Sequence, residues 1–323
     1  MTIFTGPRGS GKTVLLAKIA SEAESMGWIA IHASALPGIL DLFVEQTLEK
    51  AKEFIPAKAR FEITGIQAMG IGVTREIASE PKLSWRTQMG KYIEMLNEQG
   101  IGLLFTVDEV TAKEKGMVTL VDAFQHFVRE KRDVAMIMAG LPNNVIQLFQ
   151  HDSISFLRRA FRRNLDAISI PEVKAAVKKT VELTGRTINA DALSTASAAT
   201  QGFPFMIQLI GYHMFNQSKK KKIILDDAVS GIEIARADME NMIIDSTLRE
   251  LSDNDLKFLK AMAGDDGDSR IADIIKRMDV SAAHAGYYRR RLIELGIISP
   301  VGRGKVAINL PMLKDRLTHD SIV

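Results

Sequence analysis

A glycine-rich segment directly after a short apolar stretch constrains this chain more than any other feature of its sequence. Residues 1–5 read Met-Thr-Ile-Phe-Thr, and residues 6–13 read Gly-Pro-Arg-Gly-Ser-Gly-Lys-Thr. This is the G-x-x-x-x-G-K-T pattern of a phosphate-binding P-loop, and residues 14–23 continue with apolar positions at helical spacing. The alternative is a glycine-rich turn without a ligand. The order of strand, loop and helix favours the P-loop, because the motif requires that context.

The chemistry of this loop assigns a role to each of its parts. Gly6, Gly9 and Gly11 permit backbone turns that a Cβ atom would block. The turned backbone directs N–H groups at one anion, and the N-terminus of the following helix adds partial positive charge. Lys12 reaches the β- and γ-phosphates, and the Thr13 hydroxyl binds Mg²⁺. The predicted cofactors are ATP and Mg²⁺, and the predicted nucleotide-binding residues of the loop are Gly6, Pro7, Arg8, Gly9, Ser10, Gly11, Lys12, Thr13 and Val14.

Composition narrows the class of protein without identifying it. The 323 residues suffice for two or three domains, and contents of 46% hydrophobic and 25% charged residues are typical of globular proteins. Without cysteine the chain has no disulfide and no cysteine-ligated zinc, which agrees with a cytoplasmic location. The first residues lack the pattern of a secretory leader, and no apolar stretch is long enough for a bilayer. The net charge of +3 permits nucleic-acid binding without indicating it.

Hydrophobic patterns divide the chain into a mixed first half and a helical second half. Strand-like runs alternate with helical patterns at first, which predicts a parallel sheet flanked by helices. These runs cover residues 28–33, 101–107 and 134–139. Residues 61–82 lack a helical period and are expected to form an inserted loop or ribbon. Only helical patterns follow Pro171 as far as Leu248. The predicted domains are an α/β P-loop core over 1–170, a helical lid over 171–248 and a third domain over 249–323.

Two acidic residues end the second of these apolar runs. Asp108 and Glu109 follow a run that is typical of a strand buried on both faces. An acidic pair is common where loops start, but a P-loop upstream favours the Walker B position. Asp108 would then hold Mg²⁺, and Glu109 would act as the general base that polarises the attacking water. An extra strand between the P-loop strand and this one is the additional-strand arrangement of ATPases that use a catalytic glutamate.

An arginine-rich segment precedes the last predicted strand of the first domain. Residues 156–163 read Phe-Leu-Arg-Arg-Ala-Phe-Arg-Arg. Phosphoryl transfer needs positive charge on the γ-phosphate in the transition state. Arg159 is therefore the first candidate for an arginine finger that acts on a neighbouring subunit, and Arg158 is the second. The alternative is a solvated helix end whose cations complement the helix dipole.

Residues 249–323 show the pattern of a winged helix. Apolar faces over 251–262 and 271–278 predict two helices, and residues 284–295 predict a third, basic one, with Ser252 and Ser281 as N-caps. Residues 297–308 read as a hairpin with a basic, glycine-rich tip. A basic recognition helix and a basic wing are typical of a reader of duplex DNA. The predicted DNA contacts, mainly to phosphates, are Tyr288, Arg289, Arg290, Arg291, Arg303 and Lys305.

Two alternatives remain for these basic features. A winged helix can also serve for packing or for contact with a protein. Lys219 to Lys222 form a second basic run between two helical patterns. We expect this run to be a solvated loop, and a contact with DNA phosphates is the alternative.

The whole pattern resembles the AAA+ ATPases of the initiator clade, that is, the origin-recognition-like and archaeal-type ATPases. It is still more similar to a group of little-characterised bacterial ATP-binding proteins with the same three-part plan. The resemblance covers nearly the whole chain and implies a helical lid that places Gly202 and Pro204 against the nucleotide. It rests on the winged helix and on residues 6–13, 104–110, 138–142, 156–160 and 202–211.

Two parts of the chain depart from the AAA+ pattern. Many AAA+ lids carry an arginine sensor in the helix after Gly202, where this chain has Phe203 and Phe205 around Pro204. The first sensor is usually a polar residue at the end of the fourth strand. Here residues 138–140 read Met-Ala-Gly, with two asparagines, Asn143 and Asn144, a few residues later. Both departures resemble the signalling branch of these ATPases, in which a Gly-x-Pro lid contact holds a slowly cycling switch.

A third difference from the relatives lies at the start of the chain. Relatives have a segment before the P-loop strand that helps to form the adenine pocket. This chain starts on the strand itself. We therefore expect a truncated start, and the alternative is an adenine that only the lid holds.

These observations predict an ATP-binding protein and slow ATPase that couples its nucleotide state to the binding of duplex DNA. The alternative is a STAND-like switch, in which ATP exchange releases the winged helix toward a protein partner. A P-loop metabolic kinase is disfavoured, because nothing in the sequence indicates a small-substrate pocket. Arg158 and Arg159 further predict a homo-oligomer, and no membrane partner is expected.

Overall fold

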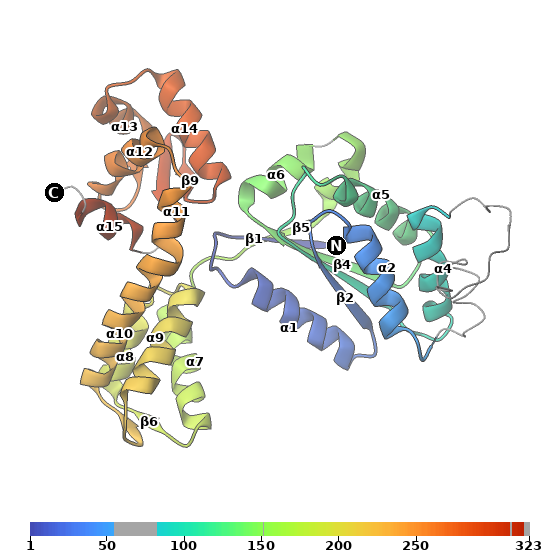
Figure 1. The fold of residues 1–323 in the computed structure, drawn as a ribbon, viewed down its shortest axis with the longest axis horizontal. Helices are drawn as coiled ribbons and strands as arrows, with labels where there is room; N and C mark the ends of the chain where they lie inside the picture. The colour runs from blue at the N-terminus through green and yellow to red at the C-terminus, as the bar shows by residue number, and fades with distance from the viewer. Residues whose placement is uncertain (55–82, 151, 311, 320–323) are drawn as a thin grey trace, which may run out of the picture. The chain divides into compact units, whose positions relative to one another are not determined.

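A five-stranded sheet forms the centre of the first half of the chain (Figure 1). The computed structural model describes residues 1–54, 83–150, 152–310 and 312–319. The loop or ribbon expected over residues 61–82 lies outside these ranges. The strand order is β2-β3-β4-β1-β5, and every neighbouring pair is parallel. The strands are β1 (Thr2–Thr5), β2 (Ile29–Ser34), β3 (Leu103–Asp108), β4 (Val134–Gly140) and β5 (Phe161–Asn164).

The order of the strands sets the type of ATPase core. β4 lies between β1, which leads into the P-loop, and β3, which ends in Asp108. This is the additional-strand arrangement that the sequence predicts, and it confirms an α/β P-loop core. The three strand-like runs of the sequence agree with β2, β3 and β4 to within one or two residues.

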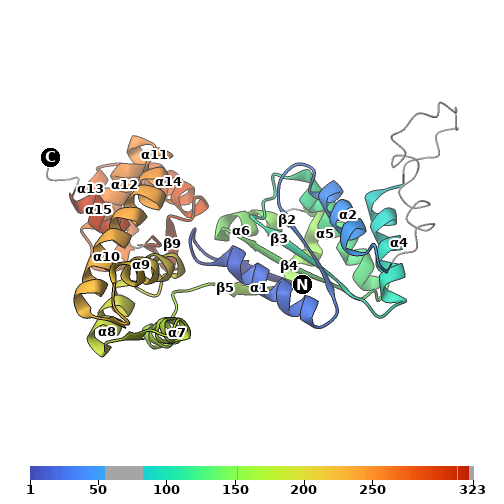
Figure 2. The same ribbon diagram turned by 60° about the horizontal axis from the view of Figure 1, so that its bottom comes forward.

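Helices pack on both faces of the sheet because successive strand residues point to opposite sides (Figure 2). On one face, Ala30 and Leu104 pack with Ala20 and Ala23 of α1. On the other face, residues such as Phe105 pack in a larger core with the remaining helices. The helices of this half are α1 (Lys12–Ser25), α2 (Ile39–Lys50), α4 (Trp85–Asn97), α5 (Lys115–Arg129), α6 (Pro142–Gln150) and the 3₁₀ helix η2 (Asp152–Arg159).

The second half of the chain is mainly helical, and its first part includes a short two-stranded ribbon. Helix α7 begins with a capping box, in which Ser169 accepts a hydrogen bond from the Glu172 backbone and Glu172 accepts one from the Ser169 backbone. The elements of this part are α7 (Ile170–Leu183), β6 (Thr187–Ile188), α8 (Ala190–Ala199), α9 (Pro204–Gln217), β7 (Lys222–Ile223), α10 (Leu225–Met239), the π-helix η3 (Glu240–Ile244) and α11 (Asp245–Arg249).

Helices and a three-stranded antiparallel sheet follow, in the element order of a winged helix. We call residues 253–308 the C-terminal module. Its N-caps confirm the sequence analysis, because Ser252 accepts from Asp255 N–H and Ser281 accepts from His284 N–H. The sheet order is β8-β10-β9. The elements are α12 (Asp253–Ala263), β8 (Ser269–Arg270), α13 (Ile271–Met278), α14 (Ala282–Glu294), β9 (Ile298–Gly302) and β10 (Lys305–Ile308), followed by α15 (Leu313–His319).

The described chain divides into two compact units, and most of the P-loop belongs to the second one. Unit 1 contains residues 1–5 and 12–164, and unit 2 contains residues 6–11 and 165–323. In unit 2 one apolar core includes both helical residues such as Met239 and residues of the C-terminal module such as Phe258. The three-domain division expected from the sequence stays a prediction, and its boundary at residue 248 falls inside this shared core. None of the helices in the described ranges combines the length and apolar character needed to cross a lipid bilayer.

Candidate functional site

In unit 1 the end of the P-loop meets the acidic end of β3. Thr13, in the first turn of α1, donates its hydroxyl to Oδ2 of Asp108 at 2.5 Å. The other carboxylate oxygen of Asp108 accepts from the backbone N–H of Glu109 at 2.8 Å. Parallel pairing in the sheet and the start of α1 thus bring together two residues that lie far apart in the sequence. These are the two residues that the sequence analysis assigns to Mg²⁺.

The chemistry of this pair fits a magnesium ion that arrives with a nucleotide. Mg²⁺ prefers oxygen ligands, and proteins usually hold it with one or two side chains together with phosphates and water. The Thr13 hydroxyl and the Asp108 carboxylate are such side chains, and they lie within hydrogen-bond distance of each other. Thr13 and Asp108 would therefore hold the ion, while the nucleotide would supply further oxygens.

Glu109 has an unusual backbone conformation. Its φ angle is +51°, in the left-handed region that non-glycine residues rarely adopt. The residue is exposed, and Val110 after it is anchored by a 3.0 Å hydrogen bond from its N–H to the carbonyl of Ala139. Such conformations cost about 1–3 kcal/mol and concentrate at functional sites.

A buried amide follows the end of β4. Asn143 lies in the first turn of α6, and its Nδ2 atom is buried without a hydrogen-bond partner among the described residues. Buried donors are nearly always paired with protein or water, so an unpaired one is a place for a ligand or a water molecule. The sequence analysis noted Asn143 only as a polar residue beyond the strand end. Its burial could not be read from the sequence.

In unit 2 the glycines of the P-loop pack against the start of α9. The backbone N–H of Phe205 donates to the carbonyl of Gly9 at 3.2 Å. A Cβ atom on Gly9 would lie 2.9 Å from the Phe203 ring, and one on Gly11 would lie 3.5 Å from Pro204. Both glycines also have positive φ angles, +77° and +83°. Both glycines are therefore needed for the turns of the loop, and Gly9 is also needed for the close approach of Phe203.

Gly202 packs on the segment that precedes α7. Its carbonyl accepts from the backbone N–H of Ile168 at 2.8 Å, and a Cβ atom there would lie 2.1 Å from the Ile168 carbonyl oxygen. Its φ angle is +73°. Gly202 thus fastens the segment before α7 to the start of α9. Pro204, two residues later, packs on the P-loop together with Phe203 and Phe205.

We expect Gly202→Ala to destabilise the chain much more than Gly185→Ala. Both glycines have positive φ angles, +73° and +76°, but only Gly202 has an atom within 4 Å of the new methyl group. The conformation alone costs about 1–2 kcal/mol, and overpacking adds about 1–3 kcal/mol at Gly202. The free energy of unfolding from chemical denaturation measures both. Equal losses would show that the Ile168 contact yields without cost.

The candidate arginine fingers have unequal surroundings. Nε of Arg158 donates to the Phe149 carbonyl at 3.3 Å, which engages this residue within unit 1. Arg159, at the end of η2, is exposed, and none of the ion pairs among the described residues includes it. Arg162, on β5, stacks its guanidinium 3.8 Å from the centre of the Phe149 ring. Arg159 is thus the more available of the two candidates.

Half of the predicted DNA contacts have partners inside the C-terminal module. Nε of Arg291 donates to Oδ2 of Asp255 at 2.9 Å, and Asp255 is fully buried. This hydrogen bond raises the pKa of Arg291 further above its ordinary value. The hydroxyl of Tyr288 accepts from Asn254 at 3.1 Å, and Lys305 lies 4.0 Å from Asp268.

The other predicted contacts define a smaller exposed surface. Arg290 and Arg303 are exposed, whereas the Nε atom of Arg289 is buried without a partner among the described residues. Tyr287, which the sequence analysis did not include, is 60% exposed and lies one turn before Arg290 on α14. We call Tyr287, Arg290 and Arg303 the basic face of the module.

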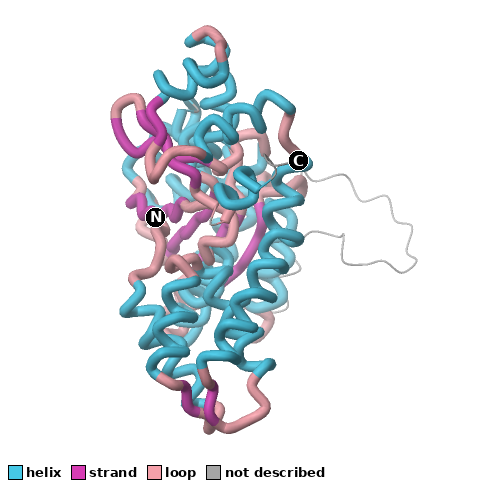
Figure 3. Tube along the Cα trace, turned by 90° about the vertical axis from the view of Figure 1, so that its left-hand side faces the viewer, coloured by secondary structure: helices cyan, strands magenta, loops and turns pink. Residues whose placement is uncertain are grey.

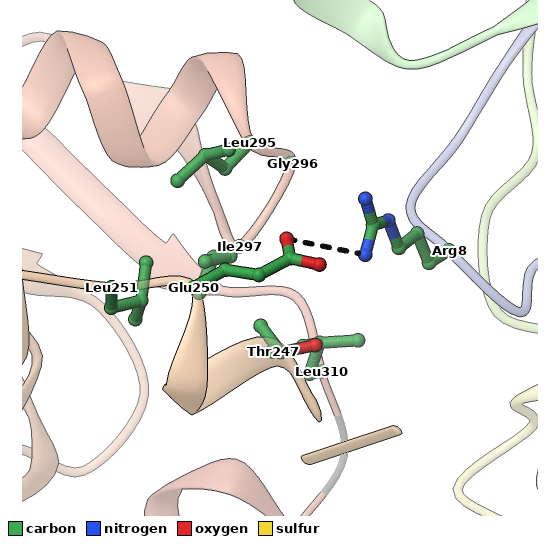
Figure 4. A pocket seen from close by; sticks show the side chains of 8 residues that line it. All are labelled: Arg8, Thr247, Glu250, Leu251, Leu295, Gly296, Ile297 and Leu310. Atoms are coloured by element: carbon green, nitrogen blue, oxygen red, sulfur yellow. Dashed lines mark ion pairs between the residues drawn. The ribbon is translucent and has the colours of Figure 1, made fainter. Parts of the chain in front are cut away.

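An ion pair joins the P-loop to the segment before the module. Nη1 of Arg8 lies 3.7 Å from Oε2 of Glu250, and both side chains are half exposed. Figure 4 shows this pair at a small pocket, where the Thr247 hydroxyl is buried without a hydrogen-bond partner among the described residues. The pocket is lined by Arg8, Thr247, Glu250, Leu251, Leu295, Gly296, Ile297 and Leu310. Sequence analysis assigned Arg8 to phosphate and gave Glu250 no role.

The sheet order, the P-loop and the acidic strand end define a P-loop ATPase core of the additional-strand type. The chain is similar to a Walker-type ATPase of Pyrococcus abyssi, with a TM-score of 0.68 and 15% identity over 98% of this chain and 90% of that one. It is also similar to the ORC2 protein of Aeropyrum pernix, solved in ADPNP–ADP complexes, with a TM-score of 0.61 and 12% identity over 99% and 88% of the two chains. At these identities the similarity shows the fold alone.

Comparisons of the sequence give a match, which covers part of the chain. Residues 241–316, from η3 to α15, match the profile of a family described as a domain of unknown function, DUF8462. A search of curated protein sequences found no match.

Proposed function

We propose that this protein binds ATP with Mg²⁺, hydrolyses ATP slowly, and couples its nucleotide state to the binding of duplex DNA. The observation that carries the nucleotide part is the hydrogen bond between Thr13 and Asp108, because it joins the two predicted magnesium ligands. Lys12 binds the phosphates, Glu109 is the general base, and Arg159 acts as the arginine finger on a second copy of the chain. The likeness in fold to an ORC2 protein solved with ADPNP and ADP supports this reading.

We expect slow hydrolysis because the segment at the start of α9 that packs on the P-loop contains no arginine. Stabilising the transition state requires fixed positive charge or donors near the γ-phosphate. The start of α9 offers Phe203, Pro204 and Phe205 to the P-loop instead of an arginine. The end of β4 is Gly140, and the first polar side chains after it belong to Asn143 and Asn144. We therefore expect turnover well below that of an ATPase with both sensors.

The basic face supports contact of the C-terminal module with duplex DNA. In helix-turn-helix readers the recognition helix enters the major groove, and flanking basic residues hold phosphates. Tyr287 and Arg290 lie on one exposed side of α14, and Arg303 lies at the turn between β9 and β10. Arg291 forms an ion pair with the buried Asp255, so the proposed surface does not include it.

The ion pair of Arg8 with Glu250 supports the coupling. Arg8 is a residue of the loop that would receive the phosphates, and Glu250 lies shortly before the module. An incoming phosphate competes with the Glu250 carboxylate for the guanidinium. Nucleotide binding would thus change a contact at the base of the module.

We expect Arg290→Ala with Arg303→Ala to weaken duplex binding about tenfold or more at low salt. Each charge-assisted contact contributes about 1.5 kcal/mol, which corresponds to about tenfold in Kd. The slope of log K against log salt should also fall by about 0.9 for each phosphate that the variant no longer neutralises. Fluorescence anisotropy with a labelled duplex measures both. The matched control removes two exposed lysines of unit 1, Lys18 and Lys52, and an equal decrease in affinity of that control would contradict the proposed surface.

A second candidate function is a nucleotide-operated switch that acts on a protein partner. The packing of Phe203 and Pro204 on the P-loop glycines favours this function, because the predicted helical lid then contacts the loop that would bind the phosphates. ATP turnover measured with and without duplex DNA separates the two functions. Stimulation by DNA that depends on Arg290 and Arg303 supports the DNA-coupled ATPase. Slow turnover that is indifferent to DNA supports the switch.

A further inference from the structure

We propose that the loop carrying Lys219, Lys220, Lys221 and Lys222, here called the lysine loop, is a second contact for the phosphate backbone of duplex DNA. This inference rests on the proposed function, since it adds a contact to the DNA complex of the C-terminal module. The loop follows α9 and runs into β7, whose first residue is Lys222, in the short ribbon of β6 and β7 (Figure 3). It therefore belongs to the helical part of unit 2 and not to the module.

The loop concentrates positive charge without compensation. All of its lysines are exposed, and no ion pair among the described residues includes any of them. The nearest acidic residues along the chain are Asp226 and Asp227, at the start of α10. Asp227 already accepts a hydrogen bond from the backbone N–H of Ile224. Like charges at neighbouring positions repel one another, and a polyanion is the ligand that relieves this repulsion.

A second observation is that the backbone beneath these lysines is fixed. The guanidinium of Arg186 donates to the carbonyl oxygens of Phe215, Ser218 and Lys220, at 2.8, 2.5 and 2.9 Å. It also stacks 4.3 Å from the centre of the Phe215 ring. The backbone N–H of Thr187 donates to the Lys221 carbonyl at 2.9 Å. A solvated charge run needs no such support.

This support has a consequence for binding. Lysine side chains are rich in rotamers, and ordering them on a mobile loop would add to the entropic cost of association. Arg186 holds the loop in place before the ligand arrives. The guanidinium of Arg186 is itself positive, so the fold places a further cation under the lysines instead of an acid.

The composition of the loop indicates the kind of contact. Ammonium groups bind phosphates as point charges and read no base sequence. Single-stranded nucleic acid is usually held by stacking on aromatic side chains, and the residues from 218 to 223 include none. A contact with the backbone of a duplex, independent of sequence, fits these residues. It would add affinity while the basic face of the module fixes the register.

The test replaces the lysine loop by Lys219→Gln, Lys220→Gln, Lys221→Gln and Lys222→Gln in the full chain. The matched control makes four changes to glutamine in unit 1, at Lys18, Lys52, Lys91 and Lys131, all of which are exposed. Both variants remove the same charge, so net charge alone predicts equal effects. Affinity for a labelled duplex is measured between about 50 and 200 mM salt. We expect at least a tenfold decrease in affinity at low salt, and a slope lower by about 0.9 for each missing phosphate contact, only in the loop variant.

A third variant tests the fixed backbone. Arg186→Lys keeps the charge but removes the fork of hydrogen bonds and the ring contact. Weaker binding with an unchanged salt slope supports the proposal, because the lysines remain but are no longer held in place. Unchanged affinity in a folded Arg186→Lys chain would overturn the role of the fixed loop.

The outcomes separate this inference from the proposed function. If the unmodified chain binds no duplex, the proposed function fails and this inference fails with it. If the unmodified chain binds and Arg290→Ala with Arg303→Ala weakens binding, while the loop variant matches its control, only this inference fails. If the loop variant no longer binds phosphatidylserine vesicles but binds DNA as before, the loop faces a membrane surface and the DNA contact is overturned.

Discussion

Replacing Lys12 with alanine should abolish measurable ATP binding. Lys12 is the first residue of α1 and the lysine of the P-loop pattern, so we expect its ammonium group to bind the β- and γ-phosphates. Charge-assisted hydrogen bonds contribute about 1.5–3 kcal/mol each. With two phosphates involved, Kd should rise at least about a hundredfold. Isothermal titration calorimetry with ATP and Mg²⁺ measures this directly.

The same helix supplies the control for this experiment. Lys18 is exposed and forms an ion pair with Glu22, one turn further along α1. Lys18→Ala therefore removes the same charge from the same helix without touching the P-loop. Its Kd should equal that of the unmodified chain. An unchanged Kd in Lys12→Ala would refute the phosphate site.

Glu109→Gln should leave ATP binding intact and reduce turnover about 10²–10⁴-fold, the usual contribution of a general base. Glutamine has the shape of glutamate but cannot accept the proton of the attacking water. The position is exposed and makes no contribution to the Thr13–Asp108 pair through its side chain. Phosphate release gives the rate, and calorimetry confirms that ATP still binds.

The control for Glu109→Gln is Glu49→Gln on α2, an exposed glutamate of unit 1. Turnover should be unchanged there. If Glu109→Gln retains full turnover, the base is another group or the activity comes from a contaminant. Duplex binding by Glu109→Gln in the presence of ATP also reports on coupling, because the nucleotide then stays in its unhydrolysed form.

The candidate phosphate site can be proposed from the sequence because most of its parts are local. The glycines, Lys12 and Thr13 follow one another, and Asp108 and Glu109 directly follow an apolar run. The helix caps Ser252 and Ser281 are equally local, since each bonds to a backbone N–H three residues on. Features that depend only on neighbouring residues can therefore be predicted from a short stretch of sequence.

The parts that could not be predicted depend on contacts between distant residues. Neither the ion pair of Arg8 with Glu250 nor the packing of Gly202 on Ile168 leaves a pattern in the sequence. The arginines of α14 show why composition alone misleads. Consecutive helical residues point about 100° apart, so Arg289, Arg290 and Arg291 cannot all face one ligand. Arg291 turns to the buried Asp255, and Arg290 turns to solvent.

Because one apolar core runs through unit 2, this unit should unfold as a single cooperative block. A cut at residue 248 would uncover Met239 and Ile244 on one side and Phe258 and Leu259 on the other, all of which are fully buried. Each such side chain stabilises the folded state by about 1.5–3 kcal/mol when it is buried. Neither fragment would keep that stabilisation. The helical part of unit 2 and the C-terminal module should therefore unfold together, so a substitution that destabilises one of them should destabilise the other.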